Sequence, residues 1–154
     1  MERLLAYRFG TKIDFGAAGN GLDYELSGFG LPENWGTWTD GPLARLGLCL
    51  VQPVERDLNL VLGSYTYVGG EHQLQEGQVV VNGTKLGTFT YQQAGLVETR
   101  ALRIPKVVAA ARGGEVIVEM LLPNAFSPAE IGKSDDQRKL GLGLVWATIA
   151  PTEH

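Results

Sequence analysis

The residue types best suited to bind a ligand are concentrated in one glycine-rich segment, residues 28–41. Two tryptophans and three polar residues share it: Trp35, Trp38, Glu33, Asn34 and Asp40. Indole rings stack on the apolar faces of sugar rings, while carboxylates and amides bond the hydroxyls. The segment therefore indicates a binding loop for a glycan or a glycan-like polyol. In a competing interpretation the same tryptophans plug one end of the fold as core residues.

A second polar segment precedes a predicted hairpin and contains His72 and Gln73. Both side chains are suited to add hydrogen bonds to the same ligand. The alternative is that this segment is a solvated connection with no role in binding.

Catalytic motifs are missing from the sequence. The two histidines are His72 and His154, there is no Gly-x-Ser-x-Gly elbow, and no loop is built to cradle phosphate. Histidines do not converge as a metal-binding enzyme requires, so no metal and no cofactor are expected. We predict a protein that is not an enzyme. The alternative is a glycosidase using Glu33 and Asp40, which would need the two carboxylates to face each other.

Composition excludes several function classes. The chain has 154 residues, of which 44% are hydrophobic and 19% are charged, as in a globular domain. The net charge of −4 argues against nucleic acid, because phosphate binding requires a basic face. No apolar run approaches the ~18 residues that would span a bilayer, so membrane insertion is not expected. We predict a single domain over residues 1–154, with its core at about 13–150.

The cellular location is left open. The first residues lack the features of a signal peptide, and Cys49 is alone. As it stands the chain would be cytoplasmic; excised from a membrane enzyme, it would be extracytoplasmic.

Strand-like alternation dominates the chain. Residues 44–50 and 58–62 place leucines on one face, which is typical of half-buried strands. Residues 22–27 are also predicted to be a strand, and residues 115–122 a central strand buried on both faces. In the last strand, residues 140–149, large residues alternate with glycine, and Trp146 falls in the leucine series.

Turn and capping signals divide the strands. Asn82-Gly83 between two β-rich runs predicts a two-residue hairpin turn. Residues 105–112 predict a short helical turn. Ser127 begins a Ser-Pro-Ala-Glu capping box, which predicts another. In the following connection, Asp136 and Arg138 are expected to form a structural ion pair that reaches the tryptophan-containing loop.

These patterns predict an all-β fold, an antiparallel two-sheet β-sandwich of the jelly-roll type with one or two short helical turns. Twenty-one glycines and seven prolines agree with many turns between short strands.

Three sequence blocks also resemble those of a known family. They are Gly-Phe-Gly-x-Pro-Glu-x-Trp-Gly-x-Trp-Thr-x-Gly, Val-Val-Val-Asn-Gly and Ser-Pro-Ala-Glu-Ile-Gly-x-Ser-x-Asp-x-Arg-x-Leu-Gly. Together they resemble a bacterial β-sandwich domain found appended to membrane-bound phosphoglycerol transferases and cell-envelope glycosyltransferases. The resemblance covers about residues 13–149, and Trp35, Trp38, Asp136 and Arg138 fall on its signature positions.

The resemblance implies an accessory module similar in kind to carbohydrate-binding modules. It implies a membrane-bound transferase as partner in other chains of the family. It does not imply transferase activity here, because no catalytic domain accompanies the module. The open alternative is a structural or protein-docking β-sandwich without a small-molecule ligand.

Overall fold

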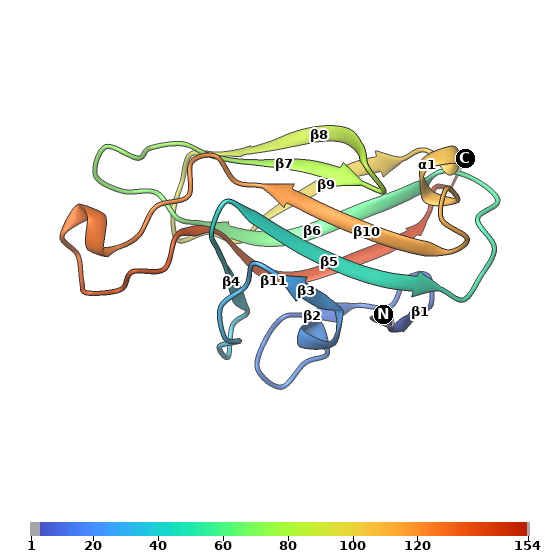
Figure 1. The fold of residues 1–154 in the computed structure, drawn as a ribbon, viewed down its shortest axis with the longest axis horizontal. Helices are drawn as coiled ribbons and strands as arrows, with labels where there is room; N and C mark the ends of the chain where they lie inside the picture. Colours follow the sequence, from blue (N-terminus) through green and yellow to red (C-terminus); the bar gives the residue numbers. More distant parts are fainter. Residues whose placement is uncertain (1–3, 154) are drawn as a thin grey trace.

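The computed structural model describes residues 4–153 and consists of two β-sheets stacked face to face (Figure 1). In this part of the chain, the larger sheet has the strand order β1-β5-β10-β7-β8, and β3 pairs with β5. Its strands are β1 (Ala6–Tyr7), β3 (Glu25–Ser27), β5 (Leu43–Leu50), β7 (Gln75–Val81), β8 (Thr84–Tyr91) and β10 (Glu115–Leu121).

The smaller sheet has the order β2-β11-β6-β9, and β4 pairs with β11. Its strands are β2 (Ile13–Asp14), β4 (Thr37–Asp40), β6 (Leu58–Thr66), β9 (Glu98–Ile104) and β11 (Leu140–Pro151). Every pairing between these strands is antiparallel except that of β1 with β5. The predicted fold class, a two-sheet jelly-roll sandwich, is confirmed.

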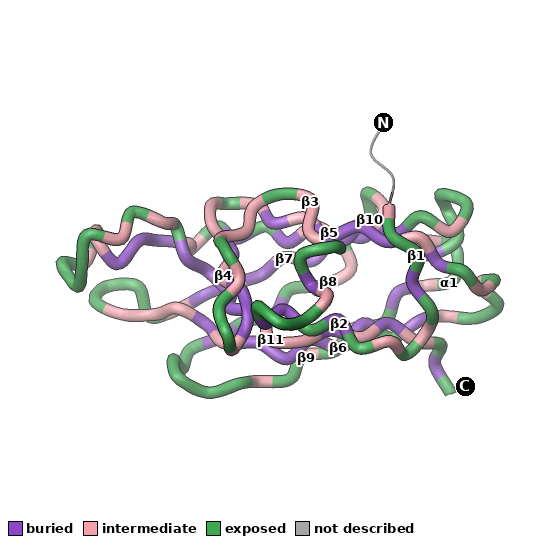
Figure 2. Tube along the Cα trace, turned by 90° about the horizontal axis from the view of Figure 1, so that it is seen from below, coloured by how far each residue is buried: buried purple, intermediate pink, exposed green. Residues whose placement is uncertain are grey.

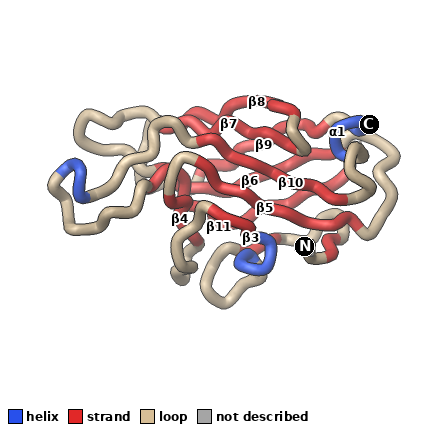
Figure 3. The backbone as a smooth tube through the Cα atoms, in the orientation of Figure 1, coloured by secondary structure: helices blue, strands red, loops and turns tan. Residues whose placement is uncertain are grey.

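Among the described residues, helical structure is limited to three short pieces, drawn in blue in Figure 3. The helix α1 (Lys106–Ala109) and the 3-10 turn η2 (Ala129–Ile131) lie where the sequence predicts helical turns. The 3-10 turn η1 (Gly21–Tyr24) replaces the first half of the strand predicted at residues 22–27. Within residues 4–153, no helix has both the length and the apolar character needed to cross a membrane.

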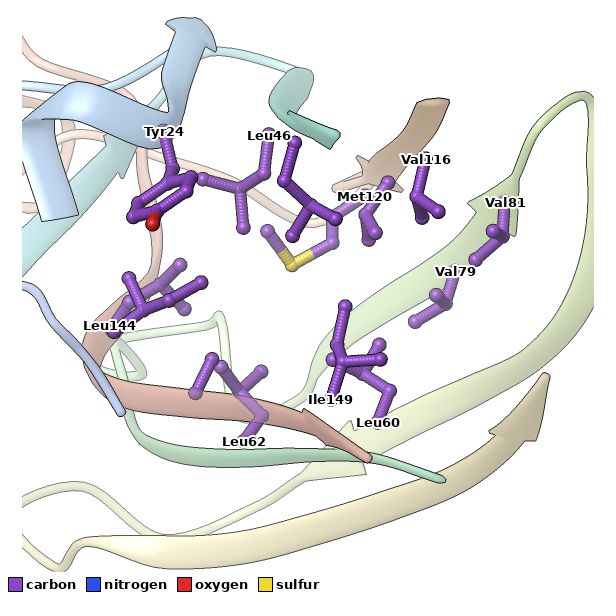
Figure 4. Close-up of a cluster of buried hydrophobic side chains, with 14 of the residues drawn as sticks. Tyr24, Leu46, Leu60, Leu62, Val79, Val81, Val116, Met120, Leu144 and Ile149 are labelled. Atoms are coloured by element: carbon purple, nitrogen blue, oxygen red, sulfur yellow. The ribbon is translucent and has the colours of Figure 1, made fainter. Parts of the chain in front are cut away.

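The core lies between the sheets because alternate strand residues point inward. In β5 and β6 the inward apolar residues are Ala44, Leu46, Leu48, Leu50, Leu58, Leu60 and Leu62, and all are buried. Figure 4 shows Leu46 and Met120 of one sheet facing Leu60, Leu62 and Ile149 of the other. Figure 2 shows exposed residues gathered in the loops and buried ones along the strands. Burial of such side chains is the main term that stabilises a sandwich of this kind.

The hairpin between β7 and β8 turns at Asn82 and Gly83, as predicted. Both residues have positive φ, 47° and 85°, which a two-residue type I′ turn requires. The Asn82 side chain also connects the hairpin to its surroundings. Its Nδ2 donates to the carbonyls of Val108 and Glu115, and its Oδ1 accepts from the amide of Ile117.

Two sequence interpretations of strands are wrong. Strand β10 is not buried on both faces: Val116, Val118 and Met120 are buried, whereas the alternate residues are half-buried or exposed. The outer face of its sheet meets solvent, so only one face needs apolar residues. Trp146 does not share a face with the leucines of β11. An irregularity between Leu144 and Trp146 inserts one extra residue and turns the indole outward.

Candidate functional site

The segment 28–41 is a short hairpin rather than an irregular loop. Its second half is β4, so the prediction of a loop is wrong for Thr37–Asp40. The amide of Gly30 donates to the carbonyl of Trp38, and the amide of Asp40 donates to the carbonyl of Gly28. Because β4 also pairs with β11, the segment is fixed against the edge of the smaller sheet.

Four aromatic rings meet at the outer face of this sheet. Trp35 contacts Trp38 with ring centroids 5.1 Å apart and Tyr65 at 5.4 Å, and Trp38 contacts Tyr67 at 5.8 Å. The interplanar angles are between 70° and 86°, so neighbouring rings stand edge to face. This arrangement gives aromatic walls at different orientations rather than one flat platform.

The rings border an open depression with a volume of about 390 Å3. Its lining consists of Trp35, Trp38, Tyr65, Thr66, Tyr67, Ala94 and Gly95. Both tryptophans are half-buried and neither belongs to the core between the sheets. We name these four rings (Trp35, Trp38, Tyr65, Tyr67) the aromatic cluster.

Strand geometry explains why the cluster forms. In β6, Ser64 and Thr66 are buried, so the alternate residues Tyr65 and Tyr67 stand on the outer face. Gly143 of β11 pairs with both Tyr65 and Trp38. A Cβ atom at Gly143 would lie 2.7 Å from Cη2 of Trp35, so glycine makes room for the indole.

Only some of the predicted polar residues reach the cluster. The Glu33 carboxylate accepts a hydrogen bond from Trp35 Nε1 at 3.4 Å, and Asn34 is exposed on the same turn. Asp40 has a structural contact, because its Oδ1 accepts from the amide of Lys139 at 2.9 Å. None of the three lines the depression.

His72 and Gln73 lie outside the depression. The His72 ring stacks on Phe126 at 4.0 Å, and Phe126 in turn contacts Tyr67 at 4.9 Å. Gln73 Nε2 donates to the carbonyl of Gly70, which closes its own turn. The structure therefore connects His72 to the cluster only through Phe126.

The connection from residue 127 to residue 139 contains the predicted capping box and a further ion pair that the sequence did not predict. Ser127 and Glu130 form a reciprocal capping box, in which each backbone amide donates to the other residue's side-chain oxygen. Glu130 also pairs with Lys139 at 2.6 Å. These bonds, that of Lys139 first, lower the pKa of Glu130 to about 2.

Asp136 and Arg138 form a two-pronged ion pair, with Arg138 Nη2 2.8 Å from Asp136 Oδ2. The pair lies against the tryptophan hairpin, since a Cβ at Gly30 would be 3.2 Å from Nη1 of Arg138. Hydrogen bonding to Asp136 raises the pKa of Arg138, and Glu33 and Asp40 add to this through their charges. Burial, with a smaller effect from Asp136, raises the pKa of Tyr67, so this hydroxyl stays protonated and able to donate.

Sequence reasoning missed Tyr65, Tyr67, Ala94 and Gly95. The signal for the tyrosines was present: they alternate with Ser64 and Thr66 and continue the outward series opposite to Leu58, Leu60 and Leu62. Nothing local marks Ala94 and Gly95, which reach the site only because the β8–β9 connection returns beside β6.

The geometry gives little support to the two alternatives, a glycosidase and a protein-docking sandwich. No carboxylate or histidine lines the depression, and within residues 4–153 no group of three metal-ligating side chains is placed to hold an ion. On the outer face of the larger sheet, an ion pair between Arg45 and Glu119 interrupts the apolar surface. Exposed large apolar residues come from separate segments: Leu5, Leu22, Leu31, Val51, Leu96, Val97, Val107 and Leu121.

Comparison with known proteins supports the fold class. No protein-family model matches the sequence, and no curated protein matches it. Among solved structures, the chain is similar to a family 36 carbohydrate-binding module in complex with calcium and xylotriose. The TM-score is 0.51 at 11% identity, over 91% of this chain and 99% of that one.

A second similar structure is the CBM36-1 domain of a multidomain xylanase from the hindgut metagenome of Trinervitermes trinervoides. Its TM-score is 0.52 at 12% identity, covering 94% of this chain and 98% of that one. The insecticidal δ-endotoxin Cry8Ea1 of Bacillus thuringiensis has a TM-score of 0.55 at 10% identity, but the match is to 26% of its chain. At such low identities the similarity shows the fold alone. The chain has the jelly-roll sandwich that is also seen in carbohydrate-binding modules.

Proposed function

We propose that this protein is a non-catalytic module that binds a glycan or glycan-like polyol at the aromatic cluster. The observation that supports it is the open depression bordered by four aromatic rings on an outer sheet face. Half-buried indoles on an outer sheet face offer stacking surface for the C–H faces of sugar rings. The fold shared with carbohydrate-binding modules agrees with this proposal and, at 11–12% identity, does not define the ligand.

The chemistry of the site favours a neutral ligand. No cationic side chain lines the depression, and the nearby Arg138 is paired with Asp136. Glu33 at the rim and the net charge of −4 disfavour phosphate or uronate groups. Hydroxyls of Tyr65 and Tyr67, the Glu33 carboxylate and the Asn34 amide are the proposed partners for sugar hydroxyls. His72, Gln73 and Asp40 have at most an indirect part in this proposal.

The proposed source of the ligand is the bacterial cell envelope. This part rests on the sequence resemblance to domains appended to envelope transferases, and a membrane-bound transferase remains the proposed partner. The site's preference for neutral groups narrows the proposal to sugar polymers rather than glycerol phosphate chains.

A glycan array followed by fluorescence titration tests the proposal. A neutral glycan should bind with a Kd of about 10 µM to 1 mM, because a shallow site anchors few groups. Trp35→Ala and Trp38→Ala should each weaken binding at least about tenfold. Leu31→Ala is the matched control, since this side chain belongs to the same hairpin and is 83% exposed. Binding that survives both tryptophan substitutions in folded protein would remove the cluster as the site.

The same preparation tests the glycosidase alternative. Aryl glycosides and any glycan identified on the array should be recovered without cleavage. Hydrolysis that is abolished by Glu33→Gln or Asp40→Asn would instead favour an enzyme. Loss of folding in both tryptophan variants, with no glycan bound by the wild type, would favour the structural alternative.

A further inference from the structure

The third tryptophan lies on the same outer sheet face as the aromatic cluster. Leu144 pairs with Ser64 and Ala147 pairs with Leu62, and all four residues are buried. Between these two pairs, Trp146 lies opposite Gly63. Since neighbouring residues of a strand point to opposite faces, Trp146 points outward, away from the core.

The Trp146 indole packs on β6 at Gly63. A Cβ atom at Gly63 would lie 2.7 Å from Cδ1 of Trp146, so the indole occupies the space above this glycine. The next outward positions are Tyr65 in β6 and Tyr67, which directly follows the end of this strand. Trp35 lies in the same way above Gly143, the β11 partner of Tyr65. In each of the two neighbouring strands β6 and β11, a glycine thus leaves room for an indole that comes from another segment.

These positions follow one another along the outer face of β6. Outward residues of a strand repeat about every 6.6 Å, so positions 63, 65 and 67 span roughly 13 Å. Polar side chains flank the Trp146 end: Asp14 pairs with Trp146 in β2, and Thr99 pairs with Gly63 in β9. Both are exposed. Rings in a row with flanking hydrogen-bonding groups suit a chain of sugar units rather than a single ring.

We propose that the binding site extends from the aromatic cluster along β6 to Trp146 and that its ligand is an unbranched neutral oligosaccharide. This inference rests on the proposed glycan-binding function and names the ligand's form. A disaccharide fills the depression at Trp35 and Trp38. A longer chain continues over Tyr65 and stacks its far units on Trp146.

Calorimetric titration with cello-, xylo-, manno- and chito-oligosaccharides of two to six units tests the extension. In the series that binds, the hexamer should bind about tenfold tighter than the dimer, one added stacking contact being worth about that factor. Trp146→Ala should abolish this gain and leave the dimer affinity unchanged, whereas Trp146→Phe should retain most of it. Val107→Ala, in the 77% exposed side chain of α1, is the control and should change neither.

Wild-type protein supplies a second readout that does not depend on the variants folding. The chain has three tryptophans and therefore three indole N–H resonances. The hexamer should shift all three and the dimer only those of Trp35 and Trp38, with Trp146→Phe giving the assignment. Equal dimer and hexamer affinity, or an unshifted Trp146 resonance with bound hexamer, would overturn the extension alone. Binding of no member of any series would overturn the proposed function and this inference with it.

Discussion

Asn82 has two separable roles, one in the backbone and one in the side chain. Its φ of 47° belongs to the hairpin turn, and its amide makes three hydrogen bonds to Val108, Glu115 and Ile117. Glycine accepts the same φ without strain but makes none of these bonds. Alanine removes the bonds and also resists the positive φ.

We therefore expect Asn82→Gly to lower the free energy of unfolding by about 1–2 kcal/mol, because three backbone partners, two of them partly buried, lose their hydrogen bonds. Asn82→Ala should cost about 1 kcal/mol more than Asn82→Gly, since it adds the strain. Urea denaturation followed by fluorescence measures both. If Asn82→Gly is as stable as the wild type, the side-chain bonds do not contribute.

At the level of single residues, the residue types within one segment identified part of the site. The remaining residues could be identified only from the direction in which strand residues point. Trp35 and Trp38 were recognisable from their polar neighbours. Tyr65 and Tyr67 required the knowledge that their face is the outer one, which alternation alone indicated. Trp146 was not predictable: one inserted residue, Val145, reverses its face, and no turn signal marks a bulge in a sequence.

The connection between η2 and β11 supports the tryptophan hairpin as an element. It holds Lys139 against Asp40 and Arg138 against Gly30. The Asp136–Arg138 pair is partly exposed, so solvent screens it and its contribution to stability is modest. Its larger effect is on the position of the hairpin that contains Trp35 and Trp38.

Arg138→Ala should lower the thermal midpoint by about 2–4 °C, as expected for a change near 1 kcal/mol in a domain of this size. It should also weaken glycan binding through a displaced hairpin, while Arg138→Lys restores part of both. Differential scanning calorimetry and titration with the array hit measure the two effects. Arg103→Ala is the control, because that pair with Asp57 is more exposed, at 61% for the arginine. Binding lost at an unchanged midpoint would place Arg138 in the site itself.

At the scale of the whole molecule, the half-buried acid Glu25 opposes folding at neutral pH. Glu25 pairs with Leu46 on the inward face, and its Oε2 has no hydrogen-bond partner among residues 4–153. Burial raises the pKa of Glu25 from 4.5 to about 7. Because the folded value is the higher one, the stabilising contribution is complete below pH 4.5 and is lost as the pH rises through 7.

The wild type should therefore lose on the order of 2 kcal/mol between pH 4.5 and pH 7.5 relative to Glu25→Gln, whose amide does not titrate. Urea midpoints across this range measure the difference. Glu71→Gln, at an exposed glutamate, should follow the wild type at every pH. A constant difference between the wild type and Glu25→Gln would contradict a titrating buried acid.

On the scale of the molecule, the sequence predicted the fold class, the core strands and two turns. It did not predict which strands pair with one another. Alternation in β5 and β6 predicted the core, and Asn82-Gly83 and Ser127–Glu130 predicted a hairpin and a capped turn where they occur. Short pieces were harder: η1 and β4 were missed because four residues contain too little periodicity to distinguish a strand from a turn. Which strands share a sheet depends on long-range pairing that no local pattern encodes.

The inserted residue in β11 also determines what a change in chain length would do to this surface. Leu144 and Ala147 both point inward, so deleting Val145 would leave a regular in–out–in series of Leu144, Trp146 and Ala147. The indole would therefore stay on the outer face after the deletion. The loss would fall on β2 instead, because the carbonyl of Val145 accepts a hydrogen bond from the amide of Phe15 at 3.0 Å. A strand shortened by one codon would thus keep the ring on this face and loosen the neighbouring edge of the sheet.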